Sequence, residues 1–222
     1  MQGATPFGAP EGVRARITKP LGSFTTPKEI HLTKSRLEAF SDAVIAIIMT
    51  IMVLELRPPS GSTPASLASL APKFLTYALS FLYLAIYWNN HHHLFQAVER
   101  VNGVVLWANI HLIFWLSLVP FVTAWAGDHP TVPLPVAIYG AVLILAAFAY
   151  YLLVRALLVL HASDSVLARA IGNDTKGKIS LVIYALAILL SMMNTAVAWV
   201  LYLAVAAIWL VPDRRIERAI AP

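Results

Sequence analysis

The sequence contains no cysteine, which excludes disulfide bonds, a thiolate nucleophile and any cysteine-ligated metal centre. It also has few charges: 12% of its 222 residues are charged, against about 25% in an ordinary soluble domain. By contrast, 59% of the residues are hydrophobic, and the charges gather between long apolar runs. A soluble protein with this pattern would need helices that are apolar all round. The composition therefore predicts an all-α membrane protein that crosses the bilayer several times.

The motifs of common enzyme classes are absent as well. The chain has no Walker-type GxxxxGK[ST], no GxSxG, no Rossmann glycine pattern and no HExxH. The first 30 residues carry charge, Gly, Pro and Thr, but no apolar core of the length that a signal peptide needs. We therefore expect a protein that is not an enzyme, and we interpret residues 1–34 as a mobile cytoplasmic tail.

Six apolar stretches are predicted to be membrane spans, at about residues 36–56, 72–95, 101–126, 132–160, 179–192 and 195–211. The last two spans come from one run of 33 residues without a charge, 179–211. A single helix of that length would be about 50 Å long, against a hydrocarbon core of about 30 Å. We therefore divide the run near residues 191–195. The alternative is one long tilted helix, which gives five spans and moves the C-terminus to the opposite side.

The distribution of Lys and Arg favours six spans. Basic residues gather in cytoplasmic loops, so a pI near 9.6 is more typical here of membrane topology than of nucleic-acid binding. With six spans, 14 of the 16 Lys and Arg residues fall on one side, and only Arg57 and Lys73 on the other. We therefore predict a protein of the cell membrane with both termini cytoplasmic, including a C-terminal tail at residues 212–222.

The first span has a narrow stripe of mostly apolar residues along one face. On a helical wheel at about 100° per residue, the stripe consists of Phe40, Ala43, Ile47, Thr50, Ile51 and Leu54. If a symmetric oligomer placed this stripe on its axis, Ile47 and Leu54 would form apolar rings that gate by dewetting, with Thr50 hydroxyls between them. The periodicity by itself favours the simpler alternative, a contact with lipid or with another helix.

A carboxylate inside the same span requires a partner. Burying Asp42 costs roughly 2.5–3.5 kcal/mol on insertion scales, and it lies about 140° from Ile47 on the wheel. Ser41 and Asp42 therefore face neighbouring helices. The candidate partners of this polar patch are Arg36 on the same span, Trp88, His91, His92 and Phe95 on one face of the second span, and Asn102 and Asn109 on the third.

Three consecutive histidines, residues 91–93, raise the question of a zinc site. Consecutive residues point about 100° apart on a helix, so at most two of these rings could converge on one ion. No cysteine and no glutamate at a matching spacing completes a ligand set. We therefore expect no resident metal and no cofactor, apart from adventitious metal binding at His91 and His92.

The segment RLEAFSD, residues 36–42, resembles the RxxxFSD signature of the transmembrane protein 175 family of potassium channels. The likeness continues through AVIAIIMTIMVLEL and through WNNHHHLF at the end of the second span, and it covers about residues 35–211. A chain with one six-span unit resembles the prokaryotic members, which form homotetramers. The family lacks a TVGYG filter, and so does this sequence.

The resemblance implies roles for particular residues. In the family, the first helix of each subunit lines a central pore. Ile47 would form the apolar constriction, with Thr50, Ile51 and Leu54 also along the pore. Arg36, Phe40, Ser41 and Asp42 would belong to the signature and the polar network behind this helix.

The predicted function is a potassium-preferring cation channel whose partners are further copies of itself, the lipid bilayer, and K⁺ and other monovalent cations. No nucleic-acid partner is expected. The alternative is a proton-conducting or proton-coupled transporter that uses Asp42 and His91/His92 as a relay.

Overall fold

The computed structural model describes residue 3 and residues 34–162, 165–171 and 175–210. Over these residues the chain is helical with connecting loops and has no strand, which confirms the predicted all-α class. The helices belong to one unit, Leu32–Pro222. The two predicted tails, residues 1–34 and 212–222, lie outside the described residues except for residues 3 and 34.

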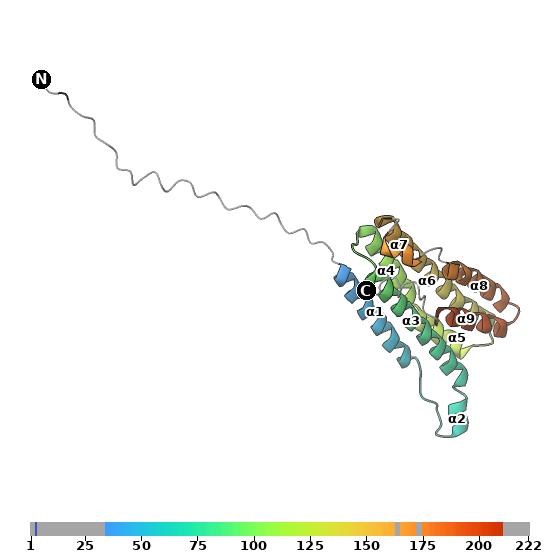
Figure 1. Ribbon diagram of the computed structural model, residues 1–222. Coiled ribbons are helices and arrows are strands. Elements are labelled where there is room, and N and C mark those ends of the chain that lie inside the picture. Colours follow the sequence, from blue (N-terminus) through green and yellow to red (C-terminus); the bar gives the residue numbers. More distant parts are fainter. Residues whose placement is uncertain (1–2, 4–33, 163–164, 172–174, 211–222) are drawn as a thin grey trace. The chain divides into compact units, whose positions relative to one another are not determined.

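Seven longer helices and two short ones make up the described part of the chain (Figure 1). The longer helices are α1 (Lys34–Leu54), α3 (Ala71–Gln96), α4 (Gly103–Ser117), α5 (Val119–Asp128), α6 (Pro133–Leu160), α8 (Thr175–Ser191) and α9 (Thr195–Leu210). The short helices are α2 (Pro64–Ala68) and α7 (Val166–Ile171). The run at residues 179–211 is thus divided after Ser191, where Met192 and Met193 form a turn.

The third predicted span consists of two helices, α4 and α5, that meet at Leu118. Pro120 is the cause, because it has no backbone N–H to donate to the preceding turn. The N–H of Leu118 accordingly donates to the carbonyl of Trp115, three residues back, at 3.2 Å. Pro120 then occupies the first turn of α5, where a missing N–H is tolerated.

Three helical stretches are long and apolar enough to cross a membrane by length and composition: α1, α4 with α5 (Gly103–Asp128), and α6. Helix α9 is apolar but shorter, with 16 residues. Helix α3 has 26 residues, but its C-terminal end carries the polar sequence NNHHH.

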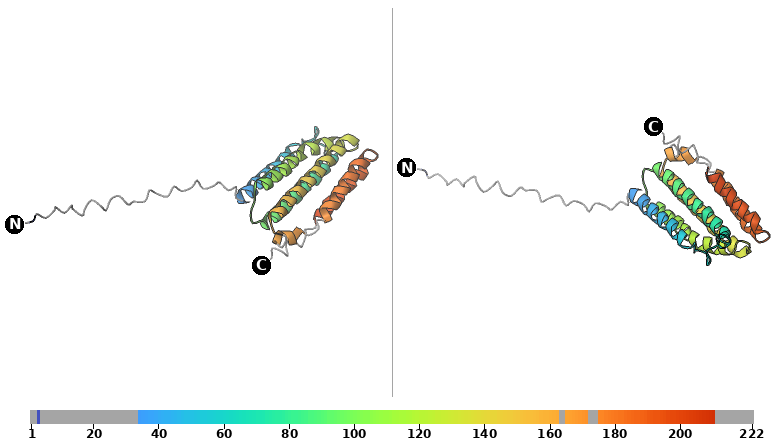
Figure 2. Two further views of the ribbon diagram at one scale, coloured as in Figure 1. Left: turned by 90° about the horizontal axis from the view of Figure 1, so that it is seen from above. Right: turned by 90° about the horizontal axis from the view of Figure 1, so that it is seen from below.

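The helices form a bundle with α1 at one edge and the α8–α9 hairpin at the other (Figure 2). Helices α3 to α6 lie between these edges, and α6 packs against both α4 and α8. The close approach of α6 to the hairpin depends on Gly140: a Cβ atom at this position would lie 2.0 Å from the Tyr202 hydroxyl. Because α1 lies at the edge, one long face of it has no neighbour among the residues that the structure describes.

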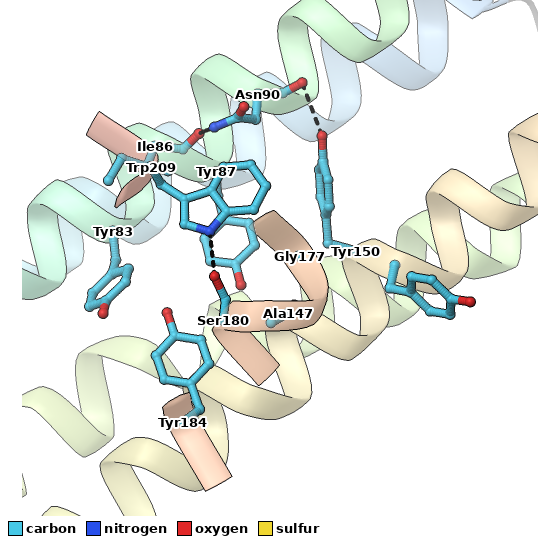
Figure 3. A pocket seen from close by; sticks show the side chains of 11 residues that line it. Tyr83, Ile86, Tyr87, Asn90, Ala147, Tyr150, Gly177, Ser180, Tyr184 and Trp209 are labelled. Carbon is cyan, nitrogen blue, oxygen red and sulfur yellow. Dashed lines mark hydrogen bonds between the residues drawn. The ribbon is translucent and has the colours of Figure 1, made fainter. Parts of the chain in front are cut away.

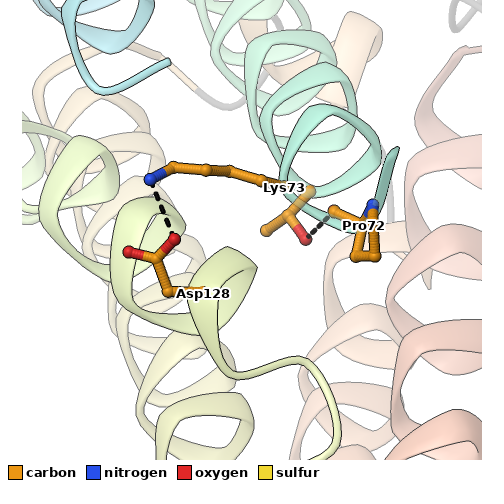
Figure 4. Close-up of polar contacts among 4 residues, drawn as sticks. Pro72, Lys73 and Asp128 are labelled. Atoms are coloured by element: carbon orange, nitrogen blue, oxygen red, sulfur yellow. Dashed lines mark hydrogen bonds and ion pairs between the residues drawn. The ribbon is translucent and has the colours of Figure 1, made fainter. Parts of the chain in front are cut away.

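An ion pair joins the N-terminal end of α3 to the C-terminal end of α5 (Figure 4). The Lys73 ammonium donates to Asp128 at 2.9 Å. Gly127 allows the close approach, because a Cβ atom there would lie 3.2 Å from the Lys73 Cα. This contact holds the start of α3 against the end of α5, behind the far end of α1.

Candidate functional site

Helix α1 has one buried face and one exposed face. The buried face consists of Leu37, Ser41, Ile45, Ile48 and Met52, each at most 4% exposed. On the opposite side, the side chains of Phe40, Ile47, Ile51 and Leu54 are 49%, 55%, 42% and 75% exposed, and Thr50 is exposed as well. The stripe expected from the sequence is therefore the face of α1 that the other described residues leave uncovered.

Thr50 is the polar member of this exposed stripe. Its hydroxyl donates to the carbonyl oxygen of Ile47 at 2.8 Å, a bond typical of threonine within a helix. Because the hydroxyl proton is used in this way, the oxygen can act toward its surroundings only as an acceptor. The exposed stripe thus offers one oxygen acceptor between apolar side chains.

The buried face of α1 is held by a chain of hydrogen bonds across three helices. His91 on α3 bonds through Nε2 to Oδ1 of Asn109 on α4 at 2.8 Å, and Asn109 Nδ2 donates to Ser41 Oγ at 2.8 Å. Ser41 in turn donates to the carbonyl oxygen of Leu37 at 2.9 Å. His91, Asn109 and Ser41 are each at most 1% exposed. These contacts fix the rotation of α1 against α3 and α4.

The order of donors and acceptors in these hydrogen bonds determines the tautomer of His91. Asn109 Oδ1 can only accept, so Nε2 of His91 must carry the proton that it donates. The other ring nitrogen, Nδ1, is buried and has no hydrogen-bond partner among the described residues. The ring stacks on Phe95 with centroids 4.4 Å apart. Nδ1 is therefore an unpaired acceptor beside the bundle core.

Asp42 has a separate partner on α3. The indole N–H of Trp88 donates to Asp42 Oδ1 at 3.1 Å, and Trp88 stacks on His92 with centroids 6.0 Å apart. His92 Nε2 accepts a hydrogen bond from the amide of Gln96 at 2.8 Å. Asp42 is partly exposed, and Trp88 is 43% exposed. The carboxylate therefore lies at the flank of α1, beside the exposed stripe.

Arg36 and Asn102 lie outside both groups of contacts. Arg36 is exposed and makes no hydrogen bond or ion pair with any residue that the structure describes. Asn102 precedes α4, and its side-chain oxygen caps that helix by accepting from the N–H of Val105 at 3.0 Å. Of the sequence candidates, the structure thus brings together Ser41, His91 and Asn109 in one group and Asp42, Trp88 and His92 in another.

The described part of the chain contains no group of three or more His, Asp or Glu side chains that could hold a metal ion. His91 and His92 each direct Nε2 to a side-chain amide, Asn109 and Gln96 respectively. The two rings therefore serve different neighbours.

A second buried polar cluster was not predicted from the sequence. Thr123 on α5 donates to Ser80 Oγ on α3 at 2.7 Å, and Ser80 also bonds to the hydroxyl of Tyr139 on α6 at 2.9 Å. All three side chains are buried. Ser80 and Thr123 stand out as polar residues inside apolar spans, which was the available signal. The cluster links α3, α5 and α6 behind the exposed edge of α1.

A small cavity lies away from α1, between α3, α6, α8 and α9 (Figure 3). Six of its lining side chains are aromatic: Tyr83, Tyr87, Tyr150, Tyr151, Tyr184 and Trp209. Its polar groups are mostly satisfied within the protein: the Trp209 indole donates to Ser180 at 2.8 Å, and the Tyr150 hydroxyl to the carbonyl of Asn90 at 3.2 Å. The cavity has no carboxylate or amine in its lining.

Comparison with known proteins identifies the family. The family model described as "Endosomal/lysosomal potassium channel TMEM175" matches residues 36–120. A protein named "Potassium channel" from Chryseobacterium sp. (strain P1-3) is 51% identical over 189 residues, which cover 85% of this chain and 98% of that protein. This chain belongs to the TMEM175 family. The resemblance to this family that the segment RLEAFSD indicated is therefore confirmed. The family match begins at Arg36, the first residue of that segment.

Other members of the TMEM175 family match over shorter stretches. A "Potassium channel" from Chamaesiphon minutus is 32% identical over 124 residues, 52% of this chain and 61% of that protein. The human "Endosomal/lysosomal proton channel TMEM175" is 33% identical over 103 residues, which cover 41% of this chain and 20% of the human protein. The family consists of ion channels rather than enzymes, and its membership together with the apolar helices makes this chain a membrane protein.

The fold agrees with a solved member of the family. The crystal structure described as a lysosomal potassium-selective channel TMEM175 homolog from Chamaesiphon minutus superposes with a TM-score of 0.72 at 26% sequence identity. The match covers 81% of this chain and 97% of the other. The bundle of α1 to α9 is therefore the fold of a TMEM175 channel subunit.

Proposed function

We propose that this chain is a potassium-preferring cation channel in which four subunits surround a central pore lined by α1. The observation that carries the proposal is the division of α1 into two faces. One face is locked to α3 and α4 by buried hydrogen bonds, and the other exposes Ile47, Thr50 and Leu54. Relatives named "Potassium channel" support the same reading.

The conduction path would be narrowest where apolar side chains meet on the axis. Ile47 and Leu54 are seven residues apart, so their rings would lie about 10 Å apart along the pore at about 1.5 Å per residue. Narrow apolar rings resist hydration and can gate ion flow by dewetting. The hydroxyl oxygen of the exposed Thr50 would supply one polar ring between them. No TVGYG segment is present, so carbonyl coordination of that type is not part of the proposal.

The proposed topology has six spans with both termini cytoplasmic. The spans are α1, α3, α4 with α5, α6, α8 and α9. Helices α8 and α9, with 17 and 16 residues, would each be about 25 Å long, a few Å short of a typical bilayer core. The positions of Lys and Arg support this orientation in the cell membrane. No cofactor is required, because ion passage involves no bond chemistry.

The test is flux of K⁺ against Na⁺ through purified protein in liposomes. Ile47→Asn should raise cation flux and relax ion preference, because a polar ring removes the dewetting barrier. Val53→Asn is the matched control, because Val53 is 50% exposed on α1, about as much as Ile47 at 55%, but lies outside the stripe. Equal effects of the two substitutions would refute α1 as the pore lining.

A second function, proton conduction, is favoured by one observation. Nδ1 of His91 is a buried acceptor without a partner among the described residues. The same ring takes part in the His91–Asn109–Ser41 hydrogen bonds that hold α1. Several animal relatives are named "proton channel". If protons pass by way of this ring, His91→Gln should abolish acid-driven proton uptake into liposomes but leave K⁺ flux. Loss of both fluxes together would instead indicate that His91 only supports α1.

A further inference from the structure

Large aromatic side chains form two exposed rows on the helices that pack against α1, one on α3 and one on α4 with α5. On α3 the row is Phe74, Phe81 and Trp88, which are 56%, 39% and 43% exposed. On α4 and α5 the row is Trp107, Phe114 and Phe121, which are 71%, 53% and 62% exposed. We name these rows the α3 aromatic face and the α4–α5 aromatic face. All three helices, α3, α4 and α5, contact α1.

The two rows have the same internal spacing. Residues seven positions apart lie two turns apart on one side of a helix, about 10 Å along its axis. Each row therefore has three members, separated by two steps, and spans about 20 Å, most of the thickness of a bilayer core. Helix α3 is followed directly by α4, so the two run in opposite directions through the bundle. Trp88 and Trp107 accordingly lie toward the shared end, and Phe74 and Phe121 toward the far end.

Symmetry requires two different contact surfaces on each subunit. In a closed ring of identical subunits, one surface of each copy meets a different surface of the next. In the proposed channel the stripe of α1 faces the pore, so it cannot also form the contact between neighbours. The subunits must then be held together by surfaces beside α1, on the helices that pack against it. The two aromatic faces occupy those helices.

We propose that the α3 aromatic face of one subunit docks on the α4–α5 aromatic face of the next copy of this chain. The steps pair by depth: Trp88 with Trp107, Phe81 with Phe114, and Phe74 with Phe121. The inference rests on the proposed tetramer and names how its subunits meet. It leaves the α8–α9 hairpin at the outside of the assembly.

The two aromatic faces supply a large part of the area that a subunit contact needs. A fully covered aromatic side chain buries roughly 150–250 Å², and the six side chains are between 39% and 71% exposed. Together they can bury roughly 650 Å², about half of the roughly 1,200 Å² at the lower end for a stable interface. The side chain of Val104, which is exposed on α4, adds to this area.

The absence of cysteine from the chain permits a clean cross-linking test. Phe81→Cys and Phe114→Cys are made separately, and the two single variants are co-expressed with different tags. A short bis-maleimide should link one variant to the other in purified protein, while each variant expressed alone should give no linked dimer. The double variant Phe81→Cys/Phe114→Cys should give a ladder that ends at four subunits.

The matched control replaces Phe114→Cys by Val159→Cys, because Val159 is 82% exposed on α6 and outside both faces. The pair of Phe81→Cys with Val159→Cys should give no dimer. If the central pair fails to fold, Phe74→Cys with Phe121→Cys tests the same contact at the far end. Folding is judged from the elution volume of each variant.

Three results would overturn the inference. Linking of one variant to itself would show that like faces meet. An assembly of four subunits without Phe81–Phe114 links would show that the two aromatic faces contact lipid. A protein that does not assemble would exclude a contact between subunits at these faces. The test is independent of the channel proposal, since the links can form whether or not Ile47→Asn alters flux. Links without any ion flux would retain the contact and refute the channel.

Discussion

The hydrogen-bond chain behind α1 gives the sharpest stability prediction. Asn109→Leu removes both bonds of the amide and keeps a branched side chain of similar shape. His91 then loses its acceptor for Nε2–H, and Ser41 loses its donor, at positions that are at most 1% exposed. Because Nδ1 of His91 already lacks a partner among the described atoms, the ring would be left with no hydrogen bond from either nitrogen.

The size of the effect follows from what such bonds contribute in a membrane. Side-chain hydrogen bonds between transmembrane helices contribute about 0.6 kcal/mol on average and up to about 1.7 kcal/mol. Two lost bonds therefore give a destabilisation of about 1–3 kcal/mol. The assay is unfolding of the purified protein by titration with SDS in mixed micelles. K⁺ flux should fall as well, because α1 would no longer be held in one rotation.

Two further variants distinguish the loss of the His91–Asn109–Ser41 hydrogen bonds from the general effect of replacing an amide side chain. Asn90→Leu is the control, because its amide donates within its own helix, to the carbonyl of Ile86 at 2.8 Å. It should cost less than half as much as Asn109→Leu. Ser41→Ala combined with Asn109→Leu should cost less than the sum of the single changes, because both remove the same bond. Strict additivity, or equal losses for the two asparagines, would refute the reasoning.

Two other predictions concern stability measured in the same way. Asp42→Asn should lower stability more than Glu55→Gln. The reason is that Asp42 accepts a hydrogen bond from the Trp88 indole, whereas no contact of the Glu55 side chain is seen in the described residues. Equal losses of stability would argue against the role of the Asp42–Trp88 contact. Gly140→Ala should cost about 1–3 kcal/mol, because its Cβ atom would lie 2.0 Å from a tyrosine hydroxyl of α9. Gly103→Ala, where nothing lies within 4 Å, should change stability by less than about 0.5 kcal/mol, and a similar cost at both glycines would contradict the packing argument.

The all-α class and the phase of the exposed stripe were predictable because they depend on local order alone. Apolar content sets the class, and the stripe follows from the 3.6-residue period of a single helix. Ile47 and Leu54 are exposed and Ile45 and Ile48 are buried, which a wheel separates without knowledge of the neighbours. The family followed from the short signature at residues 36–42.

The partners of the polar residues were harder to predict, because they depend on which helices adjoin. Arg36 and Asp42 are six residues apart, hence about 120° apart on α1, so the arginine points away from the carboxylate. Asn102 was placed inside a span that begins at residue 101, whereas α4 begins at Gly103 and Asn102 caps it. The bond between Ser80 and Tyr139 joins residues 59 positions apart, which no local pattern indicates.

The distribution of polar contacts around α1 supports one mechanical interpretation. A helix with an apolar outside can slide or turn against apolar neighbours at little cost, because lipid and leucine are similar surroundings. Hydrogen bonds between helices have fixed geometry, so a rotation of α1 breaks them. The hydrogen bonds described here from α3 and α4 to α1 are made at Asp42 and Ser41, near one end of the helix, while Ile47 to Leu54 continue beyond them with apolar packing behind. A small change in the angle at Ser41 would therefore displace Leu54 most. In the proposed pore, variants that loosen these bonds should therefore alter the ring of Leu54 side chains before the ring of Ile47 side chains.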